Sequence, residues 1–310
     1  MGMSKVQDVI SAISPGMERG SPLRKAFMRC GNPSCSHTGR YWPGLPWKRE
    51  WVLFQGRYHC SPECLEQAVA ESISRLPLRN ASKRKDHRIP LGLVLVSSGA
   101  VSQANLQAAL KAQRESGRGL VGEWLRQFGA VTEHQITAAL GMQWSRPVYP
   151  LASRRSFLEF KDLVPLAILE ASRMVIVHFI PTSRLLYAAF AKAIDHTSLY
   201  AIEQMLQCRT ESCIAEQSAL EQAIEEIRNQ PRSRELVFDT ELDPAGIART
   251  IRSYATLLNA REVRIVICCK HLWVFVDSPL QPTHLLFRIS GENNGRSDMN
   301  AEKFLDPVLQ

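Results

Sequence analysis

The spacing of four cysteines is the clearest chemical signal in the sequence. Four residues separate Cys30 from Cys35, three separate Cys60 from Cys64, and 24 lie between the two pairs. Two closely spaced thiolate pairs are typical ligands of a structural zinc ion, whose four ligands leave no open position for a substrate. We therefore predict a structural zinc site with Cys30, Cys35, Cys60 and Cys64 as ligands. The alternative is four unrelated buried cysteines.

The residues around these cysteines predict the elements that bring them together. Residues 51–59 predict two short strands with a turn at Gln55-Gly56. Ser61 is followed by a proline and a glutamate, which is a helix start that places Cys64 in the first turn of a helix ending near Arg75. A cysteine knuckle, a hairpin and a helix N-terminus together resemble a treble-clef zinc finger. A core this small depends on its metal for stability.

A doubled pattern occupies the middle of the chain. Residues 90–113 and 120–143 align at an offset of 30 with nine identities in 24 positions. The identical pairs are Gly92/Gly122, Leu95/Leu125, Gly99/Gly129, Ala100/Ala130, Val101/Val131, Ala108/Ala138, Ala109/Ala139, Leu110/Leu140 and Gln113/Gln143. Each copy predicts a short apolar helix, a left-handed glycine, an N-cap at Ser102 or Thr132, and a second amphipathic helix. One such hairpin cannot bury its own apolar face, so the two should pack as a pseudo-symmetric four-helix unit.

The doubled pattern resembles the N-terminal domain of type II secretion and type IV pilus assembly ATPases. In that family each copy begins with Leu-Gly, continues with apolar residues and a glycine, and closes on a glutamine. Some members bind cyclic di-GMP through this doubled motif. The resemblance implies that the nucleotide-contacting positions here are Leu91, Gly92, Leu95, Val96, Gly99, Gln113, Val121, Gly122, Leu125, Gly129 and Gln143.

The chain departs from the family pattern at the start of each copy. The family has an arginine before Leu-Gly, whereas this chain has Pro90 and Leu120. Arg88 and Arg118 lie two residues upstream of the two openings and are the candidates to replace it. The alternative interpretation is that the motif positions serve only as the core and caps of the hairpins.

The order of predicted elements indicates an α+β multidomain chain. Residues 151–230 predict an α/β subdomain, which in the secretion ATPases also follows the doubled motif. A further α/β module is predicted after Pro231. The expected units are a flexible N-terminus (1–25), the four-cysteine zinc finger (26–76), a basic linker (77–89), the doubled hairpin domain (90–150), the α/β subdomain (151–230), the C-terminal module (231–290) and a disordered tail (291–310).

Positive charge is concentrated at the N-terminal end. The chain of 310 residues has a net charge of +8, and residues 1–90 hold 15 Lys and Arg against 7 Asp and Glu, so the remainder is neutral. A basic region of this kind, including Lys83-Arg84-Lys85, fits nucleic acid or an acidic protein surface, and a solvated surface without a partner is the alternative.

The sequence also bears on compartment and on the remaining cysteines. No apolar run approaches the roughly 20 residues of a membrane span, and no secretory signal is visible. We therefore expect a cytoplasmic protein, in which thiols are more common than disulfides. Cys208 and Cys213 are expected to be buried thiols, and Cys268-Cys269 is expected to end a strand.

The absent motifs indicate that the protein is not an enzyme. The sequence contains no phosphate-binding G-x-x-x-x-G-K-[ST], no G-x-S-x-G and no H-E-x-x-H. We predict a regulatory or adaptor protein that senses cyclic di-GMP and docks a secretion or pilus component. One alternative is a zinc-dependent nucleic-acid-binding protein that uses the basic N-terminal third. Another is a scaffold in which zinc and repeats serve only stability and protein contacts.

Overall fold

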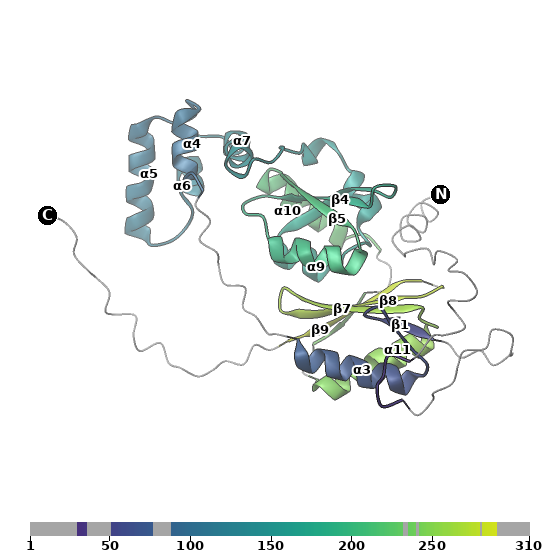
Figure 1. The fold of residues 1–310 in the computed structure, drawn as a ribbon. Helices are drawn as coiled ribbons and strands as arrows, with labels where there is room; N and C mark the ends of the chain where they lie inside the picture. Colours follow the sequence, from purple (N-terminus) through teal and green to yellow (C-terminus); the bar gives the residue numbers. More distant parts are fainter. Residues whose placement is uncertain are drawn as a thin grey trace, which may run out of the picture.

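The computed structural model describes residues 30–35, 51–76, 88–231, 235–239, 242–279 and 281–289. These residues contain a six-stranded sheet, a three-stranded sheet and helices packed against both, as expected of an α+β chain (Figure 1). The predicted flexible N-terminus, the C-terminal tail and the basic run Lys83-Arg84-Lys85 lie outside the described residues. No helix within the described ranges is long and apolar enough to cross a bilayer.

The six-stranded sheet combines strands from both ends of the chain. Its order is β2-β1-β7-β8-β9-β6. The strands are β1 (Val52–Phe54), β2 (Arg57–His59), β6 (Glu235–Phe238), β7 (Glu262–Cys268), β8 (His271–Asp277) and β9 (Thr283–Arg288). Strand β1 pairs in parallel with β7, where Phe54 lies opposite Val263. The predicted zinc-finger segment 26–76 and C-terminal segment 231–290 therefore share one sheet rather than standing as separate modules.

One face of this sheet is covered by α3 (Pro62–Arg75) and α11 (Pro244–Leu257). Ser61 caps α3 by accepting a hydrogen bond from the Cys64 amide, as the Ser-Pro-Glu sequence predicted. The two helices pack against each other, and Arg252 of α11 lies 2.8 Å from the carboxylate of Glu66 in α3. Their shared core includes fully buried Val69.

The opposite face packs on the α/β unit. The three-stranded sheet has the order β3-β4-β5. Its elements are η1 (Leu151–Ser153), η2 (Ser156–Phe160), α8 (Leu166–Ser172), β3 (Met174–Ile180), β4 (Leu185–Phe190), α9 (His196–Leu206), β5 (Arg209–Ile214) and α10 (Gln217–Arg228). Trp273 of β8 is fully buried in the core that this unit shares with the larger sheet. Arg264 of β7 donates to the Met205 carbonyl at 2.6 Å and is ion-paired with Glu262, so its buried charge is compensated.

The doubled hairpin consists of α4 (Leu91–Ser97), α5 (Gln103–Ser116), α6 (Val121–Gln127) and α7 (Glu133–Trp144). Gly99 and Gly129 follow the first helix of each copy with φ of +72° and +68°, as predicted. Helix α4 packs on α7, and α5 packs on α6. Because the first helix of each copy contacts the second helix of the other, the four helices form an interlocked pair with pseudo-two-fold symmetry.

The six-stranded sheet leads to a prediction about the stability of the protein. Phe54 in β1 is 2% exposed, and we expect Phe54→Ala to lower the free energy of unfolding by about 3–5 kcal/mol because it leaves a cavity. Hydrogen exchange should show lost amide protection in β7 as well as in residues 51–76. Phe128→Ala is the control, since this side chain is 49% exposed. Loss of protection confined to residues 51–76 would contradict the shared sheet.

Candidate functional site

The structure brings the four predicted metal ligands together. The Sγ atoms of Cys30, Cys35, Cys60 and Cys64 all lie within 4.8 Å of one another. The distance is 3.5 Å between Cys35 and Cys60 and 3.9 Å between Cys60 and Cys64. A tetrahedral ion with zinc–sulfur bonds of about 2.3 Å would hold its sulfurs about 3.8 Å apart. The cluster could therefore bind a metal ion without moving the backbone.

Local sequence explains how the two cysteine pairs meet. Asn32 shapes the first knuckle, because its side-chain oxygen accepts from the Ser34 amide at 2.9 Å and its carbonyl accepts from the Cys35 amide at 3.2 Å. The Gly31 amide then donates to the Tyr58 carbonyl at 2.7 Å, which fixes the knuckle against β2. A side chain at Gly31 would clash with β2, since a Cβ there would lie 2.7 Å from that of Arg57.

The electrostatics of the cluster also fit a cation. Burial raises the pKa of the Cys60 thiol, and the neighbouring thiols of Cys35 and Cys30 raise it further. A bound divalent cation reverses this, because it stabilises thiolates. His59 is nearly fully buried against Gly31 and Phe54, and burial lowers its pKa. It is therefore a neutral packing residue beside the four sulfurs.

The eleven motif positions of the doubled hairpin differ in their exposure. Leu95 and Leu125 are fully buried, and so are the helical positions Gly92 and Gly122. The partly buried positions are Leu91, Val96, Gln113, Val121 and Gln143, and the exposed ones are Gly99 and Gly129. The two leucines form the centre of the hairpin core, so a ligand could contact only the partly buried and exposed positions directly.

The two glutamines make equivalent contacts across the pseudo-two-fold axis. Gln113 donates through Nε2 to the Gly119 carbonyl at 2.8 Å, just before the second copy begins. Gln143 donates to the Ile89 carbonyl at 2.6 Å, just before the first copy begins. Each copy therefore ends by fixing the backbone that leads into the other. The sequence pattern showed the repeated glutamine but not this exchange.

The motif glycines allow close helix packing. A Cβ on Gly92 would lie 2.7 Å from Cδ1 of Leu106, whereas a Cβ on Gly122 would lie 3.5 Å or more from Leu91 and Ile136. Because glycine has no side chain, α4 can approach Leu106 of α5 at Gly92, and α6 can approach Leu91 of α4 and Ile136 of α7 at Gly122. Gly92 is more tightly enclosed than Gly122, so the two copies are similar but not equivalent.

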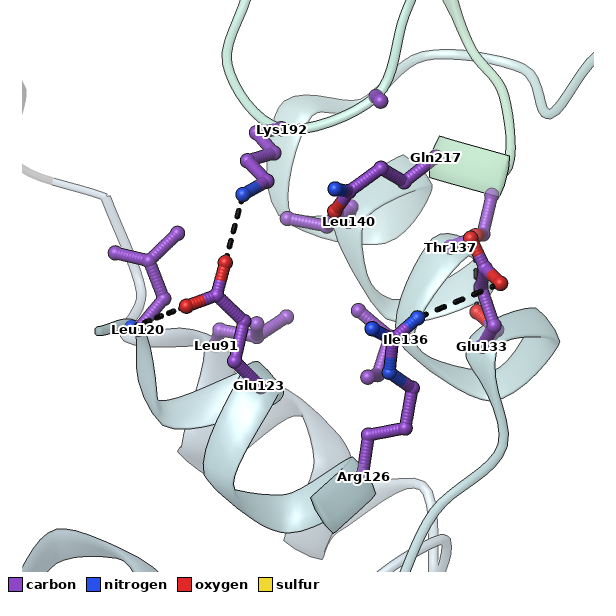
Figure 2. Close-up of a pocket in the computed structure, with 12 residues that line it drawn as sticks. Leu91, Leu120, Glu123, Arg126, Glu133, Ile136, Thr137, Leu140, Lys192 and Gln217 are labelled. Carbon is purple, nitrogen blue, oxygen red and sulfur yellow. Dashed lines mark hydrogen bonds and ion pairs between the residues drawn. The ribbon is translucent and has the colours of Figure 1, made fainter. Parts of the chain in front are cut away.

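A cavity of about 80 Å³ separates the second copy from the α/β unit. Leu91, Ile136 and Leu140 contribute apolar atoms to its wall (Figure 2). At its rim Lys192, in the loop between β4 and α9, lies 2.6 Å from Glu123 of α6. The Lys192 ammonium lowers the pKa of the Glu123 carboxyl, and the hydrogen bond from the Leu120 amide at 3.1 Å lowers it further.

Two more polar contacts hold the second copy on the α/β unit. Glu133 accepts from the Ser218 amide at 2.8 Å and so satisfies a free donor at the start of α10. His134 lies 3.1 Å from the carboxylate of Glu216. These residues were not predicted from the sequence. The sequence nevertheless held a signal for them. Glu123, Glu133 and His134, which make the polar contacts to the α/β unit, align with uncharged residues in the first copy.

The two candidate arginines differ in their surroundings. The guanidinium of Arg88 stacks over the Trp144 ring, 3.0 Å from its centroid, at the end of α7. Arg118 is exposed, and its carbonyl accepts from the Trp124 indole at 3.1 Å. Both copies thus place an arginine beside the helix starts at Pro90 and Leu120.

Part of this chain is similar to solved structures of MshE and of the XpsE N-terminal domain. A structure of MshE with cyclic di-GMP is 28% identical, covers 45% of this chain and 99% of its own, and has a TM-score of 0.40. Two structures of the XpsE N-terminal domain are each 17% identical. They cover 44% and 48% of this chain and 92% and 98% of their own, with TM-scores of 0.33 and 0.27. No protein-family model and no curated protein sequence matches the chain.

The thiol cluster predicts one zinc ion per chain. We expect elemental analysis of the purified protein to find zinc at equimolar amount. Cys60→Ser should lose it and lower the Tm, because the metal holds the knuckle and α3 on the sheet. Cys213→Ser is the control, since this buried cysteine lies in β5. Unchanged metal content in Cys60→Ser would contradict the site.

The glycine geometry predicts opposite effects for two matched substitutions. Gly92→Ala should lower the free energy of unfolding by about 1–3 kcal/mol, because the new methyl group collides with Leu106. Gly122→Ala has room and should raise it by up to about 1 kcal/mol through helix propensity. Thermal denaturation followed by circular dichroism measures both. Equal losses in the two variants would rule out this account of the packing.

Proposed function

We propose that this protein is a non-enzymatic regulatory adaptor whose doubled hairpin binds cyclic di-GMP and which docks a component of a secretion or pilus machine. The observation that carries the proposal is the repeated motif, folded as an interlocked pair with pseudo-two-fold symmetry. Cyclic di-GMP consists of two identical halves related by a two-fold axis. A ligand of this symmetry can make the same contact twice on such a surface.

The chemistry around the two helix starts suits a base and a phosphate. Leu120, at the start of the second copy, is 53% exposed, and Ile89, just before the first, is 64% exposed. Apolar side chains can cover the faces of two guanines. Arg88, Arg118 and Lys192 supply positive charge nearby for two phosphates.

The cavity beside α6 holds only part of such a ligand. At about 80 Å³ it has room for a few water molecules, so the bulk of a dinucleotide would lie over the exposed helix starts. A phosphate placed at the cavity rim would compete with Glu123 for Lys192. Ligand binding would thereby weaken one of the polar contacts between the doubled hairpin and the α/β unit. This gives the ligand a physical route by which to alter the rest of the protein.

Calorimetric titration of cyclic di-GMP into the zinc-loaded full chain tests the proposal. We expect one ligand per chain with micromolar or tighter affinity, and no binding of GTP or cyclic di-AMP. Leu120→Asp should weaken binding at least about tenfold, because it removes apolar surface that would cover a guanine and adds a negative charge that repels the nearby phosphates. Leu120→Arg should tighten it, since the resembling family has arginine at this position. Leu257→Asp in α11 is the control, because this side chain is 71% exposed.

Two outcomes would contradict the assignment of the ligand. The first is no heat from either the native chain or Leu120→Arg. The second is binding that Leu120→Asp leaves unchanged. In either case the doubled hairpin would serve as core and protein-docking surface alone, and pull-down of a partner without any small ligand would then define the function.

A further inference from the structure

Two adjacent cysteines meet the start of α9 at the junction between the large sheet and the α/β unit. Cys268 ends β7, and Cys269 is the first residue of the turn to β8. Their sulfurs lie 3.7 Å apart, and Ser198 Oγ lies 3.5 Å from the first and 3.3 Å from the second. Ser198 in turn donates to Asp195 at 2.6 Å. The cluster therefore combines two thiols, a hydroxyl and a carboxylate from two structural units.

The turn that carries Cys269 has an unusual backbone. Cys269 and Lys270 both have positive φ, at +50° and +63°. A two-residue hairpin turn of this kind favours Asn-Gly, and side chains larger than these are disfavoured in it. Such a conformation persists only where the surroundings hold it. Here the Cys269 side chain is held by Ser198 at the start of α9 and Ser172 at the end of α8.

Cys269 also differs from the other cysteines that lie away from the thiol cluster. The neighbouring Cys268 thiol lowers the pKa of Cys269 to about 7, and Ser198 adds to this, although burial and the Asp195 carboxylate oppose it. By contrast, burial raises the pKa of Cys208 and of Cys213 to about 12. Cys269 is partly exposed, whereas those two and Cys268 are buried. Of these four, it is the one whose pKa is lowered and whose side chain meets solvent.

We propose that Cys269 is an oxidation site, and that its modification loosens the contact between the large sheet and α9. The Cys269 thiolate would attack one oxygen of a hydroperoxide, ROOH. A sulfur–oxygen bond forms as the oxygen–oxygen bond breaks, and RO⁻ leaves and takes a proton from water. Sulfur is oxidised by two electrons and the peroxide is reduced, which gives a sulfenic acid.

The sulfenic acid at Cys269 should react further with a small thiol rather than with Cys268. Closure to a disulfide with Cys268 is disfavoured, because adjacent Cα atoms are about 3.8 Å apart and disulfides need about 4.4 Å or more. Condensation with a small thiol, with loss of water, is open to it. Cys269 itself is partly exposed, and Ser172 and Asp195, which interact with it, also line a cleft of about 650 Å³.

Modification would disturb the first turn of α9. Asp195 caps this helix by accepting from the amides of Thr197 and Ser198 at 3.0 and 3.3 Å. An added oxygen or thiol on Cys269 would have to displace Ser198, which lies within hydrogen-bond distance of it. Because α9 packs directly on β7, the effect would reach the interface between the two units.

The experiment treats the zinc-loaded full chain with hydrogen peroxide in the presence of dimedone, which traps sulfenic acids, and maps the label by mass spectrometry. We expect Cys269 to be labelled at least about tenfold more than Cys208 and Cys213, because thiolate character and exposure govern this reaction. Hydrogen exchange in residues 196–206 should rise in the oxidised chain. Cys269→Ser should show neither change, and Cys268→Ser should be labelled at Cys269 more slowly.

Two results would overturn the proposal. One is labelling of Cys269 no faster than that of Cys208 and Cys213. The other is full labelling of Cys269 without any change in the exchange of α9. The outcome does not depend on whether the chain binds cyclic di-GMP, so the two proposals can fail separately.

Discussion

The parallel pairing of β1 with β7 is the contact on which the rest of the architecture depends. It joins the thiol cluster and α3, near the start of the chain, to strands that are about two hundred residues away. The resulting sheet has two apolar faces, and a sheet buried on both sides needs a layer on each. Helices α3 and α11 form one layer, and the α/β unit forms the other. A metal at the thiol cluster would therefore stabilise the C-terminal strands as well as its own knuckle, because the same hairpin belongs to both.

Local physical signals accounted for most of the elements that the sequence predicted. The caps at Ser61, Ser102 and Thr132 and the left-handed glycines Gly99 and Gly129 lie where their residue types placed them. The clustering of the four cysteines could likewise be predicted, since two closely spaced cysteine pairs are typical of a metal site. What the sequence did not reveal was the joining of distant strands. Parallel pairing across such a separation leaves no local pattern, since each strand satisfies its own hydrophobic periodicity whichever neighbour it takes.

In the doubled hairpin, too, the sequence predicted the local structure but not the contacts between distant residues. Sequence identity between the copies predicted two like hairpins, but not that their helices exchange partners or that the closing glutamines bind the opposite copy. Two of the motif positions that the family resemblance implied, Leu95 and Leu125, are fully buried. A motif residue can be required for binding by shaping the helices without touching the ligand. The residues that distinguish the copies, such as Glu123 and Glu133, carry the contacts to the α/β unit instead.

The loop between β4 and α9 connects the two proposals. Within four residues it carries Lys192, which is ion-paired with Glu123 of the doubled hairpin, and Asp195, which caps α9 and binds Ser198 beside Cys269. The Lys192–Glu123 contact is weak alone, because the pair is partly exposed and surface ion pairs contribute little. A short loop tied at both ends nevertheless cannot move at one end without straining the other. If a phosphate draws Lys192 away from Glu123, the cap of α9 shifts with it, and if Cys269 is modified, the position of Lys192 changes. The two sites should therefore influence each other through this loop.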